Sequence, residues 1–413
     1  MKIAICGSGP LAIEMFFNLD RLGAQVILFA DRPLGGAIHR MVDLFPDLSM
    51  ERPYKEVTSD IGREISNLKD LSTIPTFKDY WQKYLSLLIE KIPVSFWNKN
   101  KVLRVQKRFL QEDEEIPGHG RLFDLFRLFY QMKPIDSSIH PSLEAETTPM
   151  EGLMDFDVVI DARGPIHCPK ALGGDGWALN EKAFFNASDV IYGFPSLEKL
   201  QMIKEAKKIV LAGFGMTAAL WILKLAPWIR ENQLTVVSSK VGSFIDQQRS
   251  SSLKKELNNF FEEVEMHYSS RYHTYERLLE DFEKLDDHLK MKKTSPQIPV
   301  RALSFMDGCN VMAVDRLSDR KGVFITVETA DFRVKREKLQ TLHTDFLVVA
   351  NGYRWDKDFT KGLRTCYQFD PSNKSGRHPE PGFYTLGFNA RLSDGIKQVN
   401  YIREDILSYF KKR

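Results

Sequence analysis

The feature that most constrains the fold of this chain is a glycine pattern that occurs twice, each time after a short apolar run and before a helical one. The first copy, Gly7 to Ala12 (GSGPLA), follows Lys2 to Cys6, and its Pro10 is the residue favoured at a first helical position. The second copy, Gly213 to Ala218 (GFGMTA), follows Lys208 to Ala212. An internal repeat of strand, turn and helix predicts two units built on one plan.

A second apolar run follows each helix, at Gln25 to Phe29 and at Leu234 to Val237. Phe156 to Ile160 and Phe346 to Ala350 have the same character. None of these runs has a polar face, which is typical of strands in a parallel sheet that is covered on both sides. The sequence therefore predicts an α/β fold with parallel sheets.

The spacing of the glycines has a chemical reason. In the pattern G-x-G-x-x-A, the first glycine permits a tight turn, the second lets the backbone approach a pyrophosphate, and free amides at the helix start meet the anion. We therefore expect two Rossmann-like dinucleotide-binding domains, the alternative being purely structural turns. The expected binding residues are Gly7, Gly9, Pro10 and Leu11 at the first turn and Gly213, Gly215, Met216 and Thr217 at the second.

Composition narrows the remaining classes of protein. The 413 residues carry a net charge of +3, which gives no basic footprint for nucleic acid. The longest apolar stretch, Leu211 to Trp228, contains Lys224 and the turn glycines, so no membrane span is predicted. The four cysteines lie far apart without a Cys-x-x-Cys pair, and a disulfide framework, a zinc site and a redox dithiol are all unsupported. We expect a cytoplasmic protein without a signal peptide.

Two dinucleotide turns in one chain suit an enzyme that passes a hydride between a nicotinamide and a second dinucleotide such as FAD. The sequence resembles the FAD/NAD(P)-dependent oxidoreductases with two dinucleotide-binding domains, over nearly the whole chain. In that family a Gly-Gly pair follows the second strand, a strand ends twice in Ala-Thr-Gly, and a late segment closes over the flavin. The matching residues are Gly35-Gly36, Ala162-Arg163-Gly164, Ala350-Asn351-Gly352, and Gly387 with Asn389 in PGFYTLGFNAR.

The resemblance implies how the domains follow one another along the chain. Residues 1–195 and 331–413 would form the FAD-binding domain, with an NAD(P)H-binding domain, residues 196–330, inserted into it. Residues 250–293 are charge-dense and helical and form an insert in the second domain. This insert is interpreted either as a lid or docking surface or as two solvated amphipathic helices.

Some residues depart from the family pattern at the FAD site. Ala30 replaces the acidic residue expected at the end of the second strand, and Asp31, followed by Arg32, stands one position later. Asp31 either holds the ribose hydroxyls or is a solvated loop residue. The late Asp is missing, although the amide of Asn389 can bond to a phosphate or a hydroxyl. FAD is the expected cofactor, and the alternative is a degenerate, non-enzymatic nucleotide-binding protein on the same scaffold.

The second nucleotide strand runs into Ser238, Ser239 and Lys240. A carboxylate at this place would repel a 2′-phosphate, whereas two hydroxyls and an ammonium would bind it. The sequence therefore favours NADP(H) over NAD(H) as the second cofactor. The alternative is a solvent-exposed loop lysine.

No catalytic residue is predicted, because hydride transfer to a flavin needs no acid or base. Cys168 follows His167, but neighbours in an extended segment point in opposite directions. Asp345 to Tyr353 (DFLVVANGY) resembles a stretch of N-hydroxylating flavin monooxygenases, yet the signature that these enzymes carry before the second glycine turn is absent. The resemblance implies a flavoprotein that takes hydride from NADPH and reduces a small-molecule substrate, an electron acceptor or oxygen. The acceptor and the oligomeric state stay open.

Overall fold

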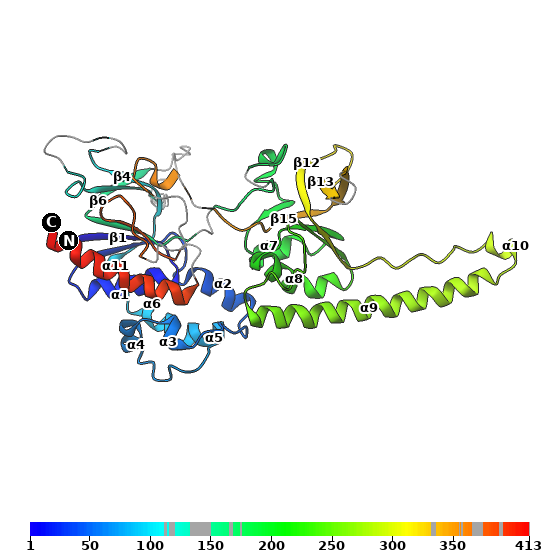
Figure 1. The fold of residues 1–413 in the computed structure, drawn as a ribbon, viewed down its shortest axis with the longest axis horizontal. Coiled ribbons are helices and arrows are strands. Elements are labelled where there is room, and N and C mark those ends of the chain that lie inside the picture. Colours follow the sequence, from blue (N-terminus) through cyan, green and yellow to red (C-terminus); the bar gives the residue numbers. More distant parts are fainter. Residues whose placement is uncertain are drawn as a thin grey trace, which may run out of the picture. The chain divides into compact units, whose positions relative to one another are not determined.

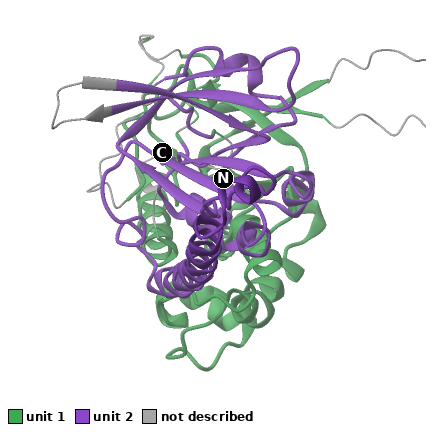
Figure 2. Cartoon of the chain, turned by 90° about the vertical axis from the view of Figure 1, so that its right-hand side faces the viewer, with its two compact units in different colours: residues 1–168, 354–413 green, residues 169–353 purple. Residues whose placement is uncertain are grey.

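The protein is described here by a computed structural model that covers residues 1–110, 114, 120–132, 150–164, 168–173, 176–331, 336–354, 356, 358–365, 375–387 and 391–412. The chain forms two compact units, coloured separately in Figure 2: residues 1–168 with 354–413, and residues 169–353. Both are built on parallel sheets, so the predicted α/β class is confirmed. The chain passes between the units at 168/169 and 353/354, whereas the sequence suggested boundaries near 195 and 331.

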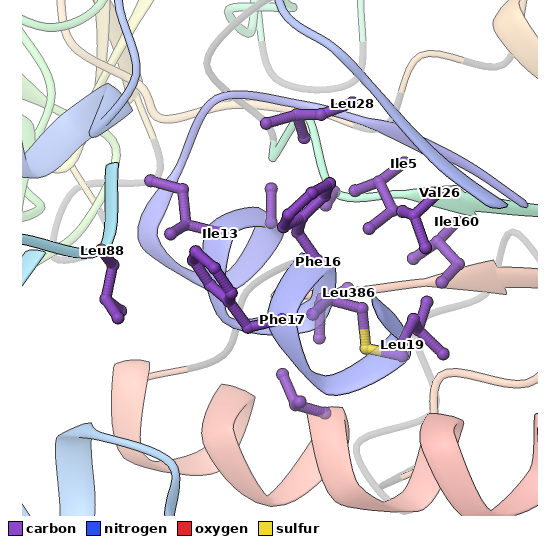
Figure 3. Packing of buried hydrophobic residues seen from close by; sticks show 14 of the residues in the cluster. Ile5, Ile13, Phe16, Phe17, Leu19, Val26, Leu28, Leu88, Ile160 and Leu386 are labelled. Carbon is purple, nitrogen blue, oxygen red and sulfur yellow. The ribbon is translucent and has the colours of Figure 1, made fainter. Parts of the chain in front are cut away.

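The first unit contains a parallel sheet with the strand order β16-β7-β1-β2-β3. Its strands are β1 (Lys2–Cys6), β2 (Gln25–Phe29), β3 (Trp97–Asn98), β7 (Val158–Asp161) and β16 (Phe383–Thr385). On one face, α1 (Pro10–Asp20) packs against the sheet and against the C-terminal helix α11 (Leu392–Lys412). Figure 3 shows this core, in which Ile13, Phe16 and Leu19 of α1 meet Ile5 of β1 and Leu386.

The opposite face of this sheet is covered by an antiparallel sheet of β4 (Lys101–Lys107), β5 (Phe126–Gln131) and β6 (Glu151–Phe156). The sequence favours two strand-like runs here, Lys101 to Phe109 and Leu122 to Tyr130, followed by a loop from Pro134 to Gly152. The structure adds β6 to this hairpin, and only its first two residues, Glu151 and Gly152, fall in the expected loop. As a result β7 begins at Val158 instead of Phe156, because Phe156 pairs with Phe126 in the second sheet.

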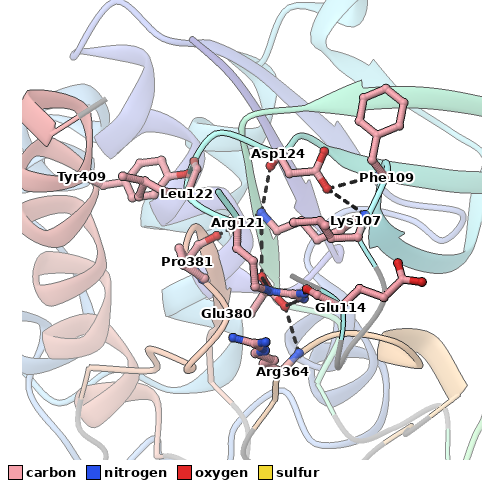
Figure 4. Close-up of polar contacts among 11 residues, drawn as sticks. Lys107, Phe109, Glu114, Arg121, Leu122, Asp124, Arg364, Glu380, Pro381 and Tyr409 are labelled. Carbon is pink, nitrogen blue, oxygen red and sulfur yellow. Dashed lines mark hydrogen bonds and ion pairs between the residues drawn. The ribbon is translucent and has the colours of Figure 1, made fainter. Parts of the chain in front are cut away.

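A buried ion cluster joins β4 and β5 to the segment that leads into β16 (Figure 4). Glu380 is fully buried and accepts two hydrogen bonds from the guanidinium of Arg121, at 3.1 and 2.5 Å, and one from the backbone amide of Arg364, at 2.9 Å. The Nζ of Lys107, also fully buried, lies 3.9 Å from Glu380 and donates to the carbonyl of Asp124 at 2.9 Å. One buried carboxylate thus serves two buried cations, which makes it the group on which the burial of both depends.

A helical region lies between β2 and β3. It consists of α2 (Gly36–Leu44), α3 (Tyr54–Val57), α4 (Asp60–Ser66), α5 (Phe77–Tyr80), the π-helix η1 (Trp81–Leu85), α6 (Ser86–Glu90) and the 3-10 turn η2 (Val94–Phe96). The Trp/Tyr-rich stretch near Phe77 to Lys91 predicts a helix. The helix is present but contains a π-helical turn, which begins at Trp81.

The second unit repeats the same plan. Its parallel sheet has the order β11-β10-β9-β15-β8, with a second, antiparallel sheet in the order β12-β13-β14. The strands are β8 (Val190–Tyr192), β9 (Lys208–Ala212), β10 (Gln233–Ser238), β11 (Leu303–Asp307), β12 (Cys309–Asp315), β13 (Val323–Asp331), β14 (Arg336–Thr344) and β15 (Phe346–Val349). Because β8 and β15 belong to the sheet of β9, residues on both sides of the suggested boundaries fall in this unit.

The remaining helices of the second unit are α7 (Leu197–Met202), α8 (Met216–Ile229), α9 (Ser251–Glu283) and α10 (Asp287–Lys290). In place of two packed amphipathic helices, the charge-dense insert forms one long helix, α9, followed by the short α10. Only Leu253, Leu257 and Phe260 of α9 are buried. Figure 1 shows α9 running past the sheets of its own unit. Within the described residues, no helix is both long and apolar enough to span a membrane.

The two passages of the chain between the units are paired with each other. The amide of Arg354 donates to the carbonyl of Cys168 at 2.8 Å, and the amide of Lys170 donates to the carbonyl of Gly352 at 2.9 Å. Pro169 and Tyr353 form an antiparallel bridge between these two bonds. The second unit therefore begins and ends at one place.

Candidate functional site

The first glycine turn is fixed by the strands on both sides of β1. Gly7 has φ +146°, a conformation that L side chains rarely adopt, and its amide donates to the carbonyl of Phe29 at 2.8 Å. A Cβ on Gly7 would overlap the carbonyl of Ala162, whose own amide donates to Cys6 at 2.8 Å. Only glycine fits a backbone that is held this closely.

The second glycine turn has the same construction. Gly213 has φ +142°, its amide donates to the carbonyl of Val237 at 2.9 Å, and a Cβ would overlap the carbonyl of Ala350. The amide of Ala350 donates to Ala212 at 2.7 Å, as that of Ala162 does to Cys6. The internal repeat in the sequence is therefore a repeat of atomic contacts.

The second glycine of each turn faces open space. A Cβ on Gly9 or on Gly215 would meet no atom within 4 Å. Each is the N-cap of a helix, α1 or α8, that has no acidic residue in its first turn and receives no capping bond from its own N-cap side chain. Among the described residues, these two helix starts combine an uncapped positive end with room for the backbone to be approached, which suits the pyrophosphate of a dinucleotide.

The Gly-Gly pair extends the first site. Gly36, at φ +52°, lies so close to Gly9 that its Cβ would stand 2.9 Å from the Gly9 Cα, and the amide of Gly35 donates to the carbonyl of Ser8 at 2.7 Å. A Cβ on Gly35 would overlap the ring of Trp81. The π-helical turn brings this ring beside the first glycine turn, where it also meets the ring of His39 edge-on at 5.0 Å.

The Ala-x-Gly segment of the first unit carries a buried ion pair. Arg163 donates to both carboxylate oxygens of Asp161 at 3.0 Å and to Asp356 at 3.1 Å, and its guanidinium lies 3.4 Å from the ring centre of Phe359. The next residue, Gly164, has φ +67°, and a Cβ there would meet no atom within 4 Å apart from its two chain neighbours.

In the second unit the corresponding Asn351 donates from Nδ2 to the carbonyl of Ala171 at 3.0 Å, and Gly352, at φ +86°, is equally open. Asp345, at the start of the same strand, accepts from the amides of Lys207 and Lys208. Asp345 therefore lies at the amino end of β15, away from the glycine turn.

The late segment of the first unit meets α1. The Leu11 side chain fills the space over Gly387 and Gly395, at both of which a Cβ would overlap it, and the amide of Gly387 donates to Gln398 at 2.9 Å. Asn389 lies outside the described residues. Gly7, Gly9, Pro10, Leu11, Gly35, Gly36, Ala162, Gly164 and Gly387 are thus gathered at the carboxyl end of β1.

The two units differ in the polarity of the residues that follow the second strand of each glycine-turn motif, β2 in the first unit and β10 in the second. Ala30 is buried, its amide donates to Asn98 at 2.9 Å, and Asp31 is the first exposed residue after β2, with Arg32 half-buried beyond it. After β10, Ser238 is buried and its Oγ accepts from the amide of Lys240 at 2.9 Å, so this hydroxyl shapes the turn.

Ser239 and Lys240 follow as exposed residues. Met216, at the first position of α8, is 59% exposed, whereas Thr217 is buried beneath it. The exposed groups of this loop are therefore one hydroxyl and one ammonium, whereas the sequence suggested two hydroxyls and an ammonium; the difference is the buried Ser238 hydroxyl.

Three residues near the turns have no signal in the sequence. Trp81 depends on the π-helical turn. The buried Gln248 donates from Nε2 to the carbonyls of Phe214 and Phe244, both at 3.1 Å, and its Oε1 has no partner among the described residues. Phe214, the middle residue of the second turn, packs edge-on against Phe244 at 5.0 Å.

Two of the three described cysteines lie where the thiolate is disfavoured. Burial raises the pKa of the Cys6 thiol, and the nearby Asp161 raises it further. Burial and Asp356 raise the pKa of Cys168, and Cys309 is buried with its sulfur 3.0 Å from the Thr329 hydroxyl. His167 and Cys366 lie outside the described residues.

The fold and the two turns together define the class. The chain has the fold of the FAD/NAD(P)-dependent oxidoreductases with two dinucleotide-binding domains, as comparison with solved structures shows. It is similar to the bacillithiol disulfide reductase YpdA from Staphylococcus aureus (12% identity, 100% and 99% of the two chains, TM-score 0.58).

Two hydroxylases are equally similar. They are the ornithine hydroxylase PvdA from Pseudomonas aeruginosa (13% identity, 99% of each chain, TM-score 0.60) and the ornithine N-hydroxylase KtzI from Kutzneria sp. 744, in a structure that names reduced FAD, NADP+ and L-ornithine (14% identity, 99% of each chain, TM-score 0.58). No family model and no curated protein matches the sequence. At these identities the likeness concerns the fold.

Proposed function

We propose that the protein is a flavin-dependent NADPH oxidoreductase that works without a cysteine relay. The observation that carries this proposal is the atomic repeat of the glycine turn, with one open anion-binding helix start in each unit. A chain that binds a single dinucleotide has use for only one such turn. Bound FAD would supply the redox chemistry, taking hydride from NADPH and passing electrons to an acceptor.

The residues that would hold FAD come from three segments. Gly9 and the start of α1 face the pyrophosphate, Gly35-Gly36 permit α2 to begin against the same turn, and Asp31 stands where a carboxylate can accept from ribose hydroxyls. Gly164 leaves the opposite side of the turn open. The domain assignment follows: the unit with β1 takes FAD and the unit with β9 takes the nicotinamide dinucleotide.

The loop after β10 supports NADPH as the donor. Ser239 and Lys240 are exposed, next to a turn that the buried Ser238 hydroxyl holds in shape. A hydroxyl and an ammonium bind a phosphate, and no carboxylate stands at this strand end to prefer a 2′-hydroxyl.

The thiols of Cys6 and Cys168 bear on which electron acceptor the flavin could reduce. Cys6 and Cys168 both have raised thiol pKa values, so neither supplies the thiolate that a disulfide relay needs. This favours electron transfer from the flavin to oxygen or to a small acceptor over disulfide reduction. Hydroxylation of an amine is one such reaction, and it is the function named for two of the structural neighbours.

The test is spectroscopic. The purified protein, or apoprotein to which FAD has been added, should show the flavin absorbance bands, and these should bleach when NADPH is added without oxygen. A protein that fails to bind FAD would contradict the proposal and favour the non-enzymatic alternative. Reoxidation through a long-lived oxygen adduct would separate a monooxygenase from a reductase.

The preference for NADPH has its own test. Lys240→Ala should raise KM for NADPH about 10- to 150-fold, the equivalent of one charge-assisted hydrogen bond of roughly 1.5–3 kcal/mol, and leave KM for NADH unchanged. Lys204→Ala is the matched control, because Lys204 is exposed and precedes β9, at the other end of the sheet. Equal bleaching by NADH and NADPH in the unmodified protein would remove the case for a phosphate site.

A further inference from the structure

The long helix α9 contains a segment whose side chains are not buried in the described part of its own unit. Its first turns are anchored through Leu253, Leu257 and Phe260, and Phe261 meets Phe244 and Phe305 at its base. Beyond this base, residues 262–283 form what we call the arm, in which no side chain is buried. Figure 1 shows the arm leaving the sheets of its unit behind.

A free helix with this sequence is not expected to be stable. In proteins, most of the stability of a helix comes from packing of an amphipathic face rather than from intrinsic propensity. The arm holds no alanine and contains tyrosines, histidines, serines and a threonine, all of which lose free energy in a helix relative to alanine. A helix of this kind depends on packing along an apolar face.

The arm has such a face, and its period is seven residues. Aromatic residues recur at Phe261, Tyr268, Tyr275 and Phe282. A second row, three residues later in each repeat, contains Val264, Arg271 and Leu278 within the helix. These rows are the a and d positions of a heptad pattern, which brings one helix against another helix rather than against a sheet. Leu278 is 54% exposed, so its helical partner is not supplied by the described part of its own unit.

We propose that the arm pairs with the arm of a second copy of this chain in an antiparallel two-helix coiled coil. Antiparallel pairing brings a positions against d positions. With the two-fold axis at residue 273, Val264 meets the second copy's Phe282, Tyr268 meets its Leu278, and Arg271 meets its Tyr275. The register is self-complementary: each apolar residue faces an apolar one, and the single arginine faces an aromatic ring.

The charges beside the seam favour this direction over the parallel one. In the antiparallel register, His267 stands next to the second copy's Asp281, and Tyr272 stands next to its own equivalent across the two-fold axis. In a parallel pair, Arg271 would face its own equivalent across the seam, a like-charge contact that disfavours assembly. Near the base of the arm, Arg301 of the same chain covers one side of the seam: its guanidinium lies 4.4 Å from the ring centre of Tyr268 and pairs with Glu265 at 3.0 Å.

Sedimentation of the full-length chain tests the assembly. The unmodified protein should be a dimer, and Leu278→Asp should raise the dissociation constant at least about hundredfold, because it places an unpaired carboxylate in the seam. Met266→Asp is the matched control: Met266 is 68% exposed, lies at an outward position of the same heptads, and should leave the dimer intact. Both variants should keep the circular dichroism and melting of the two units.

Cross-linking tests the direction. Tyr268→Cys mixed with Leu278→Cys should form a disulfide-linked dimer under mild oxidation, whereas neither variant alone should do so above the background of the unmodified chain. A monomeric protein, a dimer unaffected by Leu278→Asp, or self-cross-linking of the single variants would each overturn the proposal. None of these outcomes depends on flavin binding, so the test stands apart from that of the proposed function.

Discussion

The two glycines of the first turn should respond to alanine in opposite ways. Gly9 has φ −75°, which alanine adopts freely, and its Cβ position is open. Gly9→Ala should therefore leave the stability of the apoprotein unchanged or raise it by about 0.4–1 kcal/mol, because alanine lowers the entropy of the unfolded chain. The new methyl group stands where the pyrophosphate approaches. If it displaces two charge-assisted hydrogen bonds of about 1.5–3 kcal/mol each, FAD affinity falls more than about hundredfold.

Gly7→Ala, in contrast, should lower the stability of the apoprotein. Alanine at φ +146° costs about 1–3 kcal/mol in the backbone, and overlap with the Ala162 carbonyl adds a packing cost of similar size. A total near 3 kcal/mol lowers Tm by roughly 6–12 °C in a domain of 150–250 residues. The assay is thermal denaturation of the apoproteins beside titration with FAD.

The second turn offers the same pair, Gly215→Ala and Gly213→Ala, with NADPH as the ligand. Two results would refute the reasoning. One is a Gly9→Ala variant that binds FAD as tightly as the unmodified protein. The other is a Gly9→Ala variant that melts as low as Gly7→Ala, which would mean that the open space beside Gly9 is not available to a ligand.

Three further predictions concern buried groups. Burial lowers the pKa of His378 to about 4, against an opposing effect of Asp161, so the native protein keeps this histidine neutral, whereas the unfolded chain binds a proton below about pH 6.5. The free energy of unfolding should therefore fall by up to about 3 kcal/mol as the pH falls from 6.5 to 4. Urea denaturation should show a flatter dependence of stability on pH for His378→Asn. Glu380→Gln leaves Lys107 and Arg121 buried with too little negative charge and should cost about 3–5 kcal/mol in the same assay, whereas exchange of the exposed Glu404 for Gln should cost almost nothing. Because burial raises its thiol pKa, Cys6 should react with iodoacetamide only after unfolding, as peptide mapping can show, and labelling of the native chain would contradict its placement in β1.

The sequence could predict those turns, strands and helices that depend on residues close together along the chain. The turns at Gly7 and Gly213 are local, and their flanking strands and helices stand where the apolar runs indicated. Strand β6 was missed because its partner β5 lies more than twenty residues earlier, and strand pairing at that distance leaves no periodic trace in a sequence such as EGLMDF.

The sequence missed parts of the site for a related reason: they depend on local helix geometry or on distant contacts that leave no pattern in the sequence. Trp81 reaches Gly35 only because one helical turn is widened, and a wider turn does not change the apolar spacing on either side of it. The pairing of Arg163 with Asp356 joins residues nearly two hundred positions apart. The charge-dense insert was correctly interpreted as helical, but a seven-residue period does not reveal whether one long helix or two short ones carry it.

The paired passages at Cys168–Arg354 and Lys170–Gly352 also bear on the order in which the chain folds during synthesis. Once residue 353 has left the ribosome, the second unit is complete and its two ends can be joined. The first unit, although it contains the N-terminus, still lacks β16 at the edge of its sheet and α11, whose Val399, Ile402 and Ile406 bury the outer side of α1. The unit that begins first is therefore expected to finish last, with the apolar face of α1 exposed to chaperones until β16 and α11 have left the ribosome.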